Sequence, residues 1–194
     1  MSQVTAIIGL GNPGPEYAAT RHNAGFWLVD AIASSVHGEL RPEKKFLGHY
    51  AKVRIGDQDV HLLKPATFMN RSGAAVAALT QFFKLAPENL LVAHDELDLP
   101  AGQARYKTGG GHGGHNGLRD IASALGNQKQ FHRVRIGVGH PGDARQVTNY
   151  VLGRAGKDEQ AAIERAIEEC QATLPMALAG DWAKAMNQLH SLKL

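Results

Sequence analysis

The sequence contains a single cysteine, Cys170. An intrachain disulfide framework, a paired-cysteine metal site and a redox pair are therefore excluded, because each of them requires at least two thiols. Cys170 falls in a stretch with helical periodicity, where an isolated cysteine usually behaves as a small buried hydrophobic side chain. We expect it to pack in the core and to take no part in catalysis.

Long apolar runs are also missing. No uncharged stretch approaches the roughly 18 residues that a membrane-spanning helix needs. The first residues lack the basic-then-apolar pattern of a secretory signal. These absences predict a cytoplasmic protein with no membrane partner.

Two common catalytic signatures are absent as well. The chain has no Walker-type phosphate loop, and no serine or cysteine stands in a nucleophile-elbow pattern. Gly9, Gly11 and Gly14 match the spacing of a dinucleotide-binding loop, but that loop needs a helix to begin inside it and an acidic residue at the end of the next strand. Here the next helix is expected well after the loop, and Asp30 falls within that helix. We therefore expect no nucleotide cofactor.

The bulk composition is that of an ordinary globular protein. A length of 194 residues, with 43% apolar and 20% charged side chains, predicts one compact domain. No repeat, low-complexity segment or linker divides the sequence, so we expect a single domain over residues 1–194. Glycine is the exception, since 22 glycines make up about 11% of the chain against the usual ~7%. Several of them cluster between Gly109 and Gly117, which indicates a local cause.

Short β-branched runs alternate with stretches of helical periodicity. Strands are expected at 4–10, 49–55, 60–63, 90–93, 103–108 and 131–138, and helices at 26–36, 72–84, 118–125 and from about 158 onward. One hairpin, formed by the second and third of these strands, interrupts the alternation. The pattern predicts an α/β fold, a single domain with a mixed, mostly parallel, twisted sheet flanked by helices.

A histidine stands beyond the end of the first expected strand. The run Val4–Leu10 is followed by a loop rich in glycine and proline, and helical periodicity resumes only at Phe26. His22 therefore lies just before a helix, where open α/β sheets place their ligand crevice. An imidazole, with an ordinary pKa of about 6.5, can take a proton from water near neutrality, so His22 is a candidate general base.

Other polar side chains follow strand ends and have complementary abilities. Asp95 comes directly after a buried apolar strand, and its carboxylate can accept a hydrogen bond from the second ring nitrogen of His22. Asn12, Asn70 and Asn116 stand in loops and offer amide groups to a carbonyl, a peptide backbone or a water. Since no serine or cysteine nucleophile is in place, we infer that water attacks an activated acyl bond such as an ester.

Three further patterns leave alternatives open. The glycine run 109–117 allows positive backbone angles in a flexible loop, or it lets the backbone approach a bulky ligand. His94, His112 and His115, together with Asp95, raise a metal hypothesis, but no helical His-Glu-His pattern accompanies them and we expect no metal.

A group of basic residues forms either a solvated face or an electrostatic footprint for phosphates. This group consists of Arg105, Lys107, Arg119, Lys129, Arg133 and Arg135.

Two longer motifs and three shorter segments match one known family. The motifs are Tyr17-x-x-Thr-Arg-His-Asn-x-Gly25 and Gly111-x-x-x-His-Asn-Gly-Leu-Arg-Asp-Ile121. The shorter segments are Gly9–Gly14, Lys64–Asn70 and His94–Glu96, in the same order along the chain. Over essentially its whole length, the sequence resembles the bacterial-type peptidyl-tRNA hydrolases.

The resemblance implies an enzyme that hydrolyses the ester between a peptide and the 3′ ribose of tRNA. Such an enzyme recycles tRNA from peptidyl-tRNA that has dropped off ribosomes. By this resemblance His22 is the base and Asp95 its partner. Asn12 would help to distinguish blocked from free aminoacyl groups, and Asn70 and Asn116 would position the peptide, the ester or the attacking water.

The resemblance also implies a partner, peptidyl-tRNA, and residues that bind it. Tyr17 and Phe68 would line the pocket for the 3′ end, while Lys107 and Arg135 would bind the 5′ phosphate region. Family members are usually monomers and need no cofactor. The alternatives to be tested are a non-catalytic RNA-binding module and a metal-dependent hydrolase.

Overall fold

A computed structural model describes residues 3–192 of the chain. The strands are β1 (Ala6–Gly9), β2 (Arg41–Glu43), β3 (Gly48–Ile55), β4 (Gln58–Pro65), β5 (Leu90–Glu96), β6 (Ala104–Thr108) and β7 (His132–Gly137). The helices are α1 (Ala24–Ser35), α2 (Ser72–Phe83), α3 (Asn116–Ala124), α4 (Val147–Val151), α5 (Lys157–Leu178) and α6 (Trp182–His190). In this described part of the chain, no helix has both the length and the apolar character that crossing a membrane requires.

The strands form one seven-stranded sheet in the order β2-β3-β4-β1-β5-β7-β6. Its centre is parallel, with β1 between β4 and β5, and with β7 beside β5. Its two edges are antiparallel, through the pairs β2–β3, β3–β4 and β6–β7. The predicted α/β fold with a mixed sheet is confirmed, and the parallel pairs are gathered in the middle rather than spread through most of the sheet.

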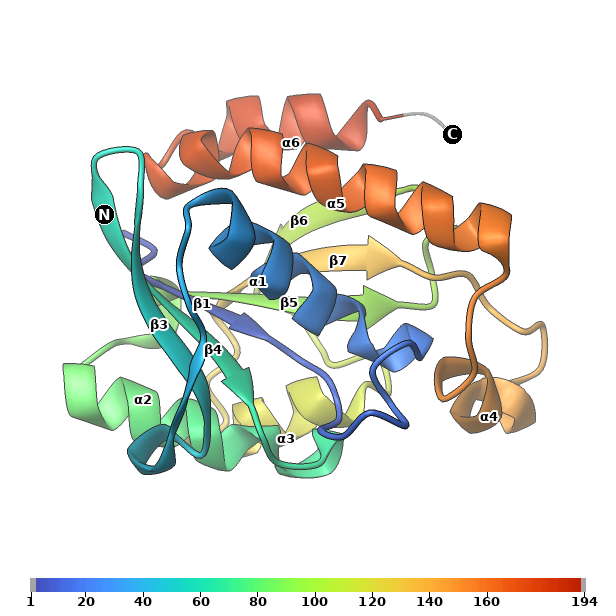
Figure 1. The fold of residues 1–194 in the computed structure, drawn as a ribbon, viewed down its shortest axis with the longest axis horizontal. Coiled ribbons are helices and arrows are strands. Elements are labelled where there is room, and N and C mark those ends of the chain that lie inside the picture. The colour runs from blue at the N-terminus through green and yellow to red at the C-terminus, as the bar shows by residue number, and fades with distance from the viewer. Residues whose placement is uncertain (1–2, 193–194) are drawn as a thin grey trace.

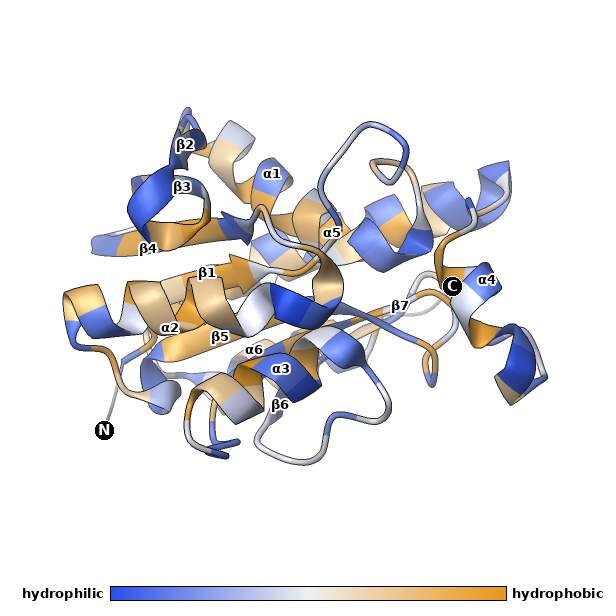
Figure 2. Cartoon of the chain, turned by 90° about the horizontal axis from the view of Figure 1, so that it is seen from below, coloured by the Kyte–Doolittle hydropathy of each residue, from blue (hydrophilic) through white to orange (hydrophobic). Residues whose placement is uncertain are grey.

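Helices cover both faces of the sheet, as Figures 1 and 2 show. On one face α1, α5 and α6 enclose a core that includes Ile7 and Ile163. On the other face α2 and α3 enclose a second core, which includes Ile8 of β1 and Leu79 of α2. Neighbouring residues of a strand point to opposite faces, which explains why the apolar run of β1 is buried on both sides. Cys170 is 2% exposed in α5, as expected for a core side chain.

Three segments differ from the sequence-based expectation. β5 continues to Glu96, so His94 and Asp95 belong to a strand that pairs with β7 and not to the loop after it. β2 and α4 have only 3 and 5 residues and were not anticipated. Elements of this length are too short to display a hydrophobic period.

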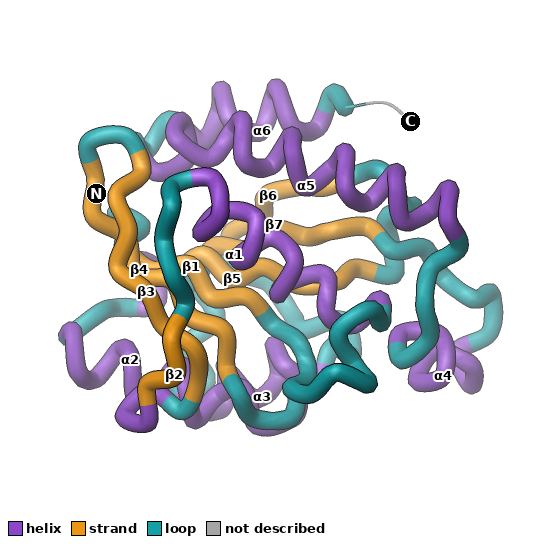
Figure 3. Tube along the Cα trace, in the orientation of Figure 1, coloured by secondary structure: helices purple, strands orange, loops and turns teal. Residues whose placement is uncertain are grey.

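Two glycines allow α1 to pack directly on the centre of the sheet. A Cβ on Gly25 would lie 2.3 Å from the carbonyl oxygen of Ala93, and a Cβ on Gly9 would lie 2.5 Å from the carbonyl oxygen of Gly25. Glycine at these positions therefore serves helix–sheet packing. The contact holds the turn Arg21–Asn23, which precedes α1 and carries His22, against β5. The loops that follow the central strands gather at this end of the sheet (Figure 3).

Candidate active site

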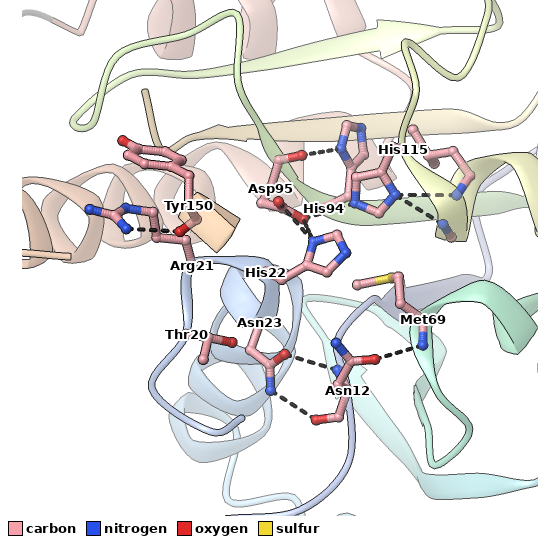
Figure 4. A network of polar contacts seen from close by, with 12 residues as sticks. Asn12, Thr20, Arg21, His22, Asn23, Met69, His94, Asp95, His115 and Tyr150 are labelled. Atoms are coloured by element: carbon pink, nitrogen blue, oxygen red, sulfur yellow. Dashed lines mark hydrogen bonds and ion pairs between the residues drawn. The ribbon is translucent and has the colours of Figure 1, made fainter. Parts of the chain in front are cut away.

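A carboxylate lies between two imidazoles near the carboxyl end of β5 (Figure 4). The Nδ1 atom of His22 lies 3.0 Å from both carboxylate oxygens of Asp95, and Nε2 of His115 lies 2.8 Å from Oδ1. The Asp95 side chain is only 2% exposed. The structure thus brings together the predicted base and its predicted carboxylate partner, and it adds His115, for which sequence reasoning had raised only a metal role.

The members of this cluster shift one another's pKa values in opposite directions. Burial alone disfavours the anionic form of Asp95, but the two neighbouring imidazoles outweigh it and hold the pKa of this carboxyl well below its ordinary value. Burial likewise disfavours the cationic form of His22, yet the adjacent carboxylate prevails and raises the pKa of this imidazole. Asp95 is therefore ionised and accepts the hydrogen of His22 Nδ1, which leaves Nε2 of the neutral ring as an acceptor.

His115 is held in one tautomer by the start of α3. Its Nδ1 atom accepts hydrogen bonds from the backbone N–H groups of Gly117 and Leu118, at 3.2 and 3.4 Å. Because Nδ1 is an acceptor, the ring proton is on Nε2, and this N–H group donates a hydrogen bond to Asp95. Within residues 3–192, His22, Asp95 and His115 form the one group whose potential metal-ligand atoms lie within 4.8 Å of one another. Their facing atoms are already engaged in these hydrogen bonds, so the arrangement fits a hydrogen-bonded triad better than a metal centre.

The other two histidines of the metal hypothesis lie outside that group. His94 is buried, and its Nδ1 donates to the backbone carbonyl of Asp95 at 2.8 Å. Burial and the nearby His115 lower the pKa of His94 to about 4, so this ring stays neutral at ordinary pH. His112 uses its Nδ1 to accept from the backbone N–H of Gly114. Both side chains therefore have local structural partners.

Asn12 is oriented by contacts with two other segments. Its Oδ1 accepts a hydrogen bond from the backbone N–H of Met69 at 2.7 Å. Its own backbone N–H donates to Oδ1 of Asn23 at 2.8 Å, and Nδ2 of Asn23 donates to the Asn12 carbonyl at 3.0 Å. The Nδ2 group of Asn12 thereby keeps its donors for a ligand. Sequence reasoning assigned no specific role to Asn23, which is 1% exposed and positions Asn12.

The triad and Asn12 lie beside one cleft, whose volume is about 280 Å³. The predicted site residues that line it are Asn12, His22, Phe68, Asn70, Asp95 and Asn116. Tyr17 is not part of this lining, and its ring packs edge-to-face on Phe68 with the ring centroids 6.2 Å apart. Another wall comes from the α4 segment, which no sequence signal indicated. Its lining residues are Val147, Thr148, Val151 and Leu152.

The predicted phosphate-binding residues lie beside a separate small hollow of about 80 Å³. In the antiparallel pair β6–β7, Arg105 is opposite Arg135 and Lys107 is opposite Arg133. Because side chains alternate along a strand, all four cationic side chains project from one face of this pair. Nε of Arg135 donates to Oε1 of Glu96 at 2.7 Å, which leaves its terminal guanidinium nitrogens for a ligand. Lys107 is exposed.

One of these cations has a structural task instead. Arg133 is 3% exposed, and its two terminal nitrogens donate to the carbonyls of Gly111 and Gly110 at 2.6 and 2.7 Å. In the glycine run, four residues have φ angles between 59° and 93°, a region that glycine enters without strain. They are Gly109, Gly110, Gly113 and Gly114. The glycine excess therefore has a conformational cause, and Arg133 holds the loop in place.

Comparisons with known proteins agree with this geometry. The family model described as peptidyl-tRNA hydrolase matches residues 6–194. A peptidyl-tRNA hydrolase of Chromohalobacter salexigens is 70% identical over 98% of both chains, and one of Pseudomonas putida is 58% identical over 100% of both. The crystal structure of the peptidyl-tRNA hydrolase from Acinetobacter baumannii has a TM-score of 0.96 at 48% identity, and covers 100% of this chain and 97% of its own. The resemblance seen in the sequence is confirmed: the chain belongs to the peptidyl-tRNA hydrolase family, whose activity is that of a carboxylic ester hydrolase.

Proposed function

We propose that this protein releases the peptide from peptidyl-tRNA by attack of water on the ester at the 3′ ribose, with His22 as the general base. The observation that carries the proposal is that His22 lines the cleft with its Nε2 atom unbonded to any of residues 3–192, while Asp95 holds the opposite ring nitrogen. Neutral imidazole takes a proton from water as the new carbon–oxygen bond forms. The carboxylate stabilises the imidazolium that results.

In the second step, His22 gives its proton to the leaving group. Collapse of the tetrahedral intermediate breaks the bond between the acyl carbon and the ribose oxygen, and the imidazolium returns its proton to that oxygen. The products are a tRNA with a free 3′ hydroxyl and a peptide carboxylic acid, which carries the second proton of the attacking water and releases it to solvent as it ionises. His115 stays outside this proton transfer, because its Nδ1 caps α3 and its Nε2 holds Asp95 in place.

The amide of Asn12 supplies a means of rejecting aminoacyl-tRNA. Since its oxygen is occupied by the N–H of Met69, it presents N–H donors to the cleft. A carbonyl of an N-blocked residue accepts from these donors, whereas a free ammonium group is itself a donor and leaves them unpaired. Discrimination against a group that leaves buried polar atoms unpaired is strong. Asn70 and Asn116 share the binding of the acyl group and the attacking water.

The tRNA is held by contacts common to all its acylated forms. Lys107 and Arg135 bind backbone phosphates, and the aromatic pair Tyr17–Phe68 lies where the 3′ end enters the cleft. Such contacts carry no information about the peptide sequence, as recycling of varied peptidyl-tRNAs in the cytoplasm requires. We propose that the single domain acts as a monomer without a cofactor.

A matched pair of histidine substitutions tests the assignment of the base. His22→Asn and His37→Asn each remove one imidazole. His37 is exposed in the turn after α1, and asparagine tolerates its φ of 56°. With N-acetyl-aminoacyl-tRNA as substrate, His22→Asn is expected to lower kcat by about 10²–10⁴-fold, because general-base help is lost. His37→Asn should match the wild type, and both variants should bind uncharged tRNA normally. Near-normal turnover by His22→Asn would remove the basis of the proposal.

A further inference from the structure

The residue that precedes His22 is a buried arginine with no part in the mechanism above. Arg21 is 8% exposed, and its Nη1 donates to the backbone carbonyl of Tyr150 at 2.9 Å (Figure 4). The guanidinium carbon also lies 3.8 Å from the centroid of the Tyr150 ring. Its Nη2 is 3.7 Å from a carboxylate oxygen of Glu159 at the start of α5. The guanidinium group therefore makes its contacts within the protein, and we do not assign it to phosphate binding.

Tyr150 belongs to α4, the short helix that forms one wall of the cleft. A helix of 5 residues has almost no stability of its own and depends on the contacts around it. Tyr150 supplies one such contact through its hydroxyl, which donates to the carbonyl of Val138 at 2.7 Å. The backbone N–H of Arg21 supplies another, because it donates to the carbonyl of Gly153 just beyond α4. The position of the wall thus depends on the segment just after β7 on one side and on the His22 turn on the other.

The geometry points to Arg21 as a positioning residue that clamps α4 to the turn carrying His22, and thereby keeps the apolar wall of the cleft preformed for the acyl part of the substrate. This inference rests on the proposed function of the cleft. When the clamp is removed, only a fraction of molecules has the wall in place, and the apparent affinity falls by that fraction. The hydrogen bonds between His22 and Asp95 involve other atoms, so the proton transfer itself is unaffected.

The experiment measures KM and kcat separately for Arg21→Met, on N-acetyl-aminoacyl-tRNA and across a range of pH. We expect KM to rise about tenfold, as it does when one molecule in ten has the competent conformation. The value of kcat and the midpoint of its pH profile should stay at the wild-type level. Hydrogen exchange should become faster at the amides of residues 147–153 and remain unchanged in β5. Arg21→Lys should give an intermediate KM, because a lysine keeps the charge but lacks the planar group that both stacks and donates.

Three further variants separate the clamp from general effects of charge and stability. Arg145→Met removes an exposed cation of the same segment, which pairs with Asp143, and should leave KM unchanged. Tyr150→Leu removes the ring on which the Arg21 guanidinium stacks and also the hydroxyl that bonds Val138, whereas Tyr150→Phe removes only the hydroxyl. KM should therefore rise more in the leucine variant than in the phenylalanine variant. If Arg21→Met does not fold, Tyr150→Leu carries the test alone.

Three outcomes would overturn the inference. A fall in kcat with KM unchanged, or a displaced pH midpoint, would mean that Arg21 acts through His22. A lower melting temperature with unaltered KM would mean that Arg21 only stabilises the fold. Unchanged hydrogen exchange in residues 147–153 would mean that α4 does not depend on the clamp. Failure of the proposed function itself would appear separately, as normal turnover by His22→Asn.

Discussion

Replacing Asp95 with asparagine keeps the shape of the side chain and removes the charge between the two imidazoles. The His115 Nε2–H group is a fixed donor, since its Nδ1 accepts from the start of α3, so the amide oxygen of the new residue remains with His115. The amide nitrogen then faces Nδ1 of His22, which must become an acceptor. His22 consequently carries its proton on Nε2, in the tautomer that cannot act as a base.

The size of the effect follows from the observed geometry. The nitrogen of His22 lies 3.0 Å from the carboxylate oxygens, in a cluster that is almost fully buried. Two unit charges with centres about 4 Å apart, at an effective dielectric constant of about 20, attract by about 4 kcal/mol. Because this attraction develops as His22 becomes charged, its loss lowers kcat by about 10³-fold.

The assay is hydrolysis of N-acetyl-aminoacyl-tRNA by Asp95→Asn, with Asp57→Asn as the control. Asp57 is an exposed carboxylate in the turn between β3 and β4. The affinity of Asp95→Asn for uncharged tRNA should equal that of the wild type, because the charge pair lies deep in the cleft. A kcat within tenfold of wild type, or a loss of tRNA affinity as large as the loss of rate, would refute the reasoning.

Further predictions follow from pKa, charge and packing. The kcat of the wild type should fall as pH decreases through a midpoint above 6.5, since the Asp95 carboxylate raises the pKa of His22 and only the neutral imidazole accepts a proton; a flat profile of kcat against pH would contradict this. Lys107→Ala and Arg135→Ala should each weaken tRNA binding and reduce the slope of log affinity against log salt by about one, as titrations at several salt concentrations would show; an unchanged slope would mean that these cations only solvate the surface. Gly25→Ala should destabilise the fold by about 1–3 kcal/mol in urea unfolding, because the new Cβ would meet the carbonyl oxygen of the sheet at 2.3 Å; unchanged stability would show that α1 shifts freely.

The parts of the site that could be predicted are those with a local signal. His22 and Asp95 stand next to strand and helix boundaries that hydrophobic periodicity reveals. Arg105 and Lys107 share one face of β6, and Arg133 and Arg135 share one face of β7, as the two-residue period of a strand predicts. Such signals need only neighbouring residues, which is why they survive in a single sequence.

The parts that could not be predicted depend on contacts between distant segments. The role of Asn23 exists only because its amide meets the backbone of Asn12 across the first loop. The role of His115 requires both the cap of α3 and the approach of Asp95 from β5. The helix α4, with 5 residues, has no period to detect and is held by Tyr150. Tertiary partners of this kind leave no trace in local periodicity.

The cleft consists of one part that is fixed by strand pairing and another part that is held by contacts between separate segments. Asp95 lies in β5, which is paired on both sides, so its charge is fixed before a substrate arrives. Preorganised charge of this kind lowers the barrier of the chemical step because no reorganisation is needed. The surfaces proposed to meet the peptide are instead the exposed Asn70 and the short helix α4. An enzyme that cleaves one kind of ester on many peptides needs this division, and substitutions in the first part should therefore act on kcat and those in the second on KM.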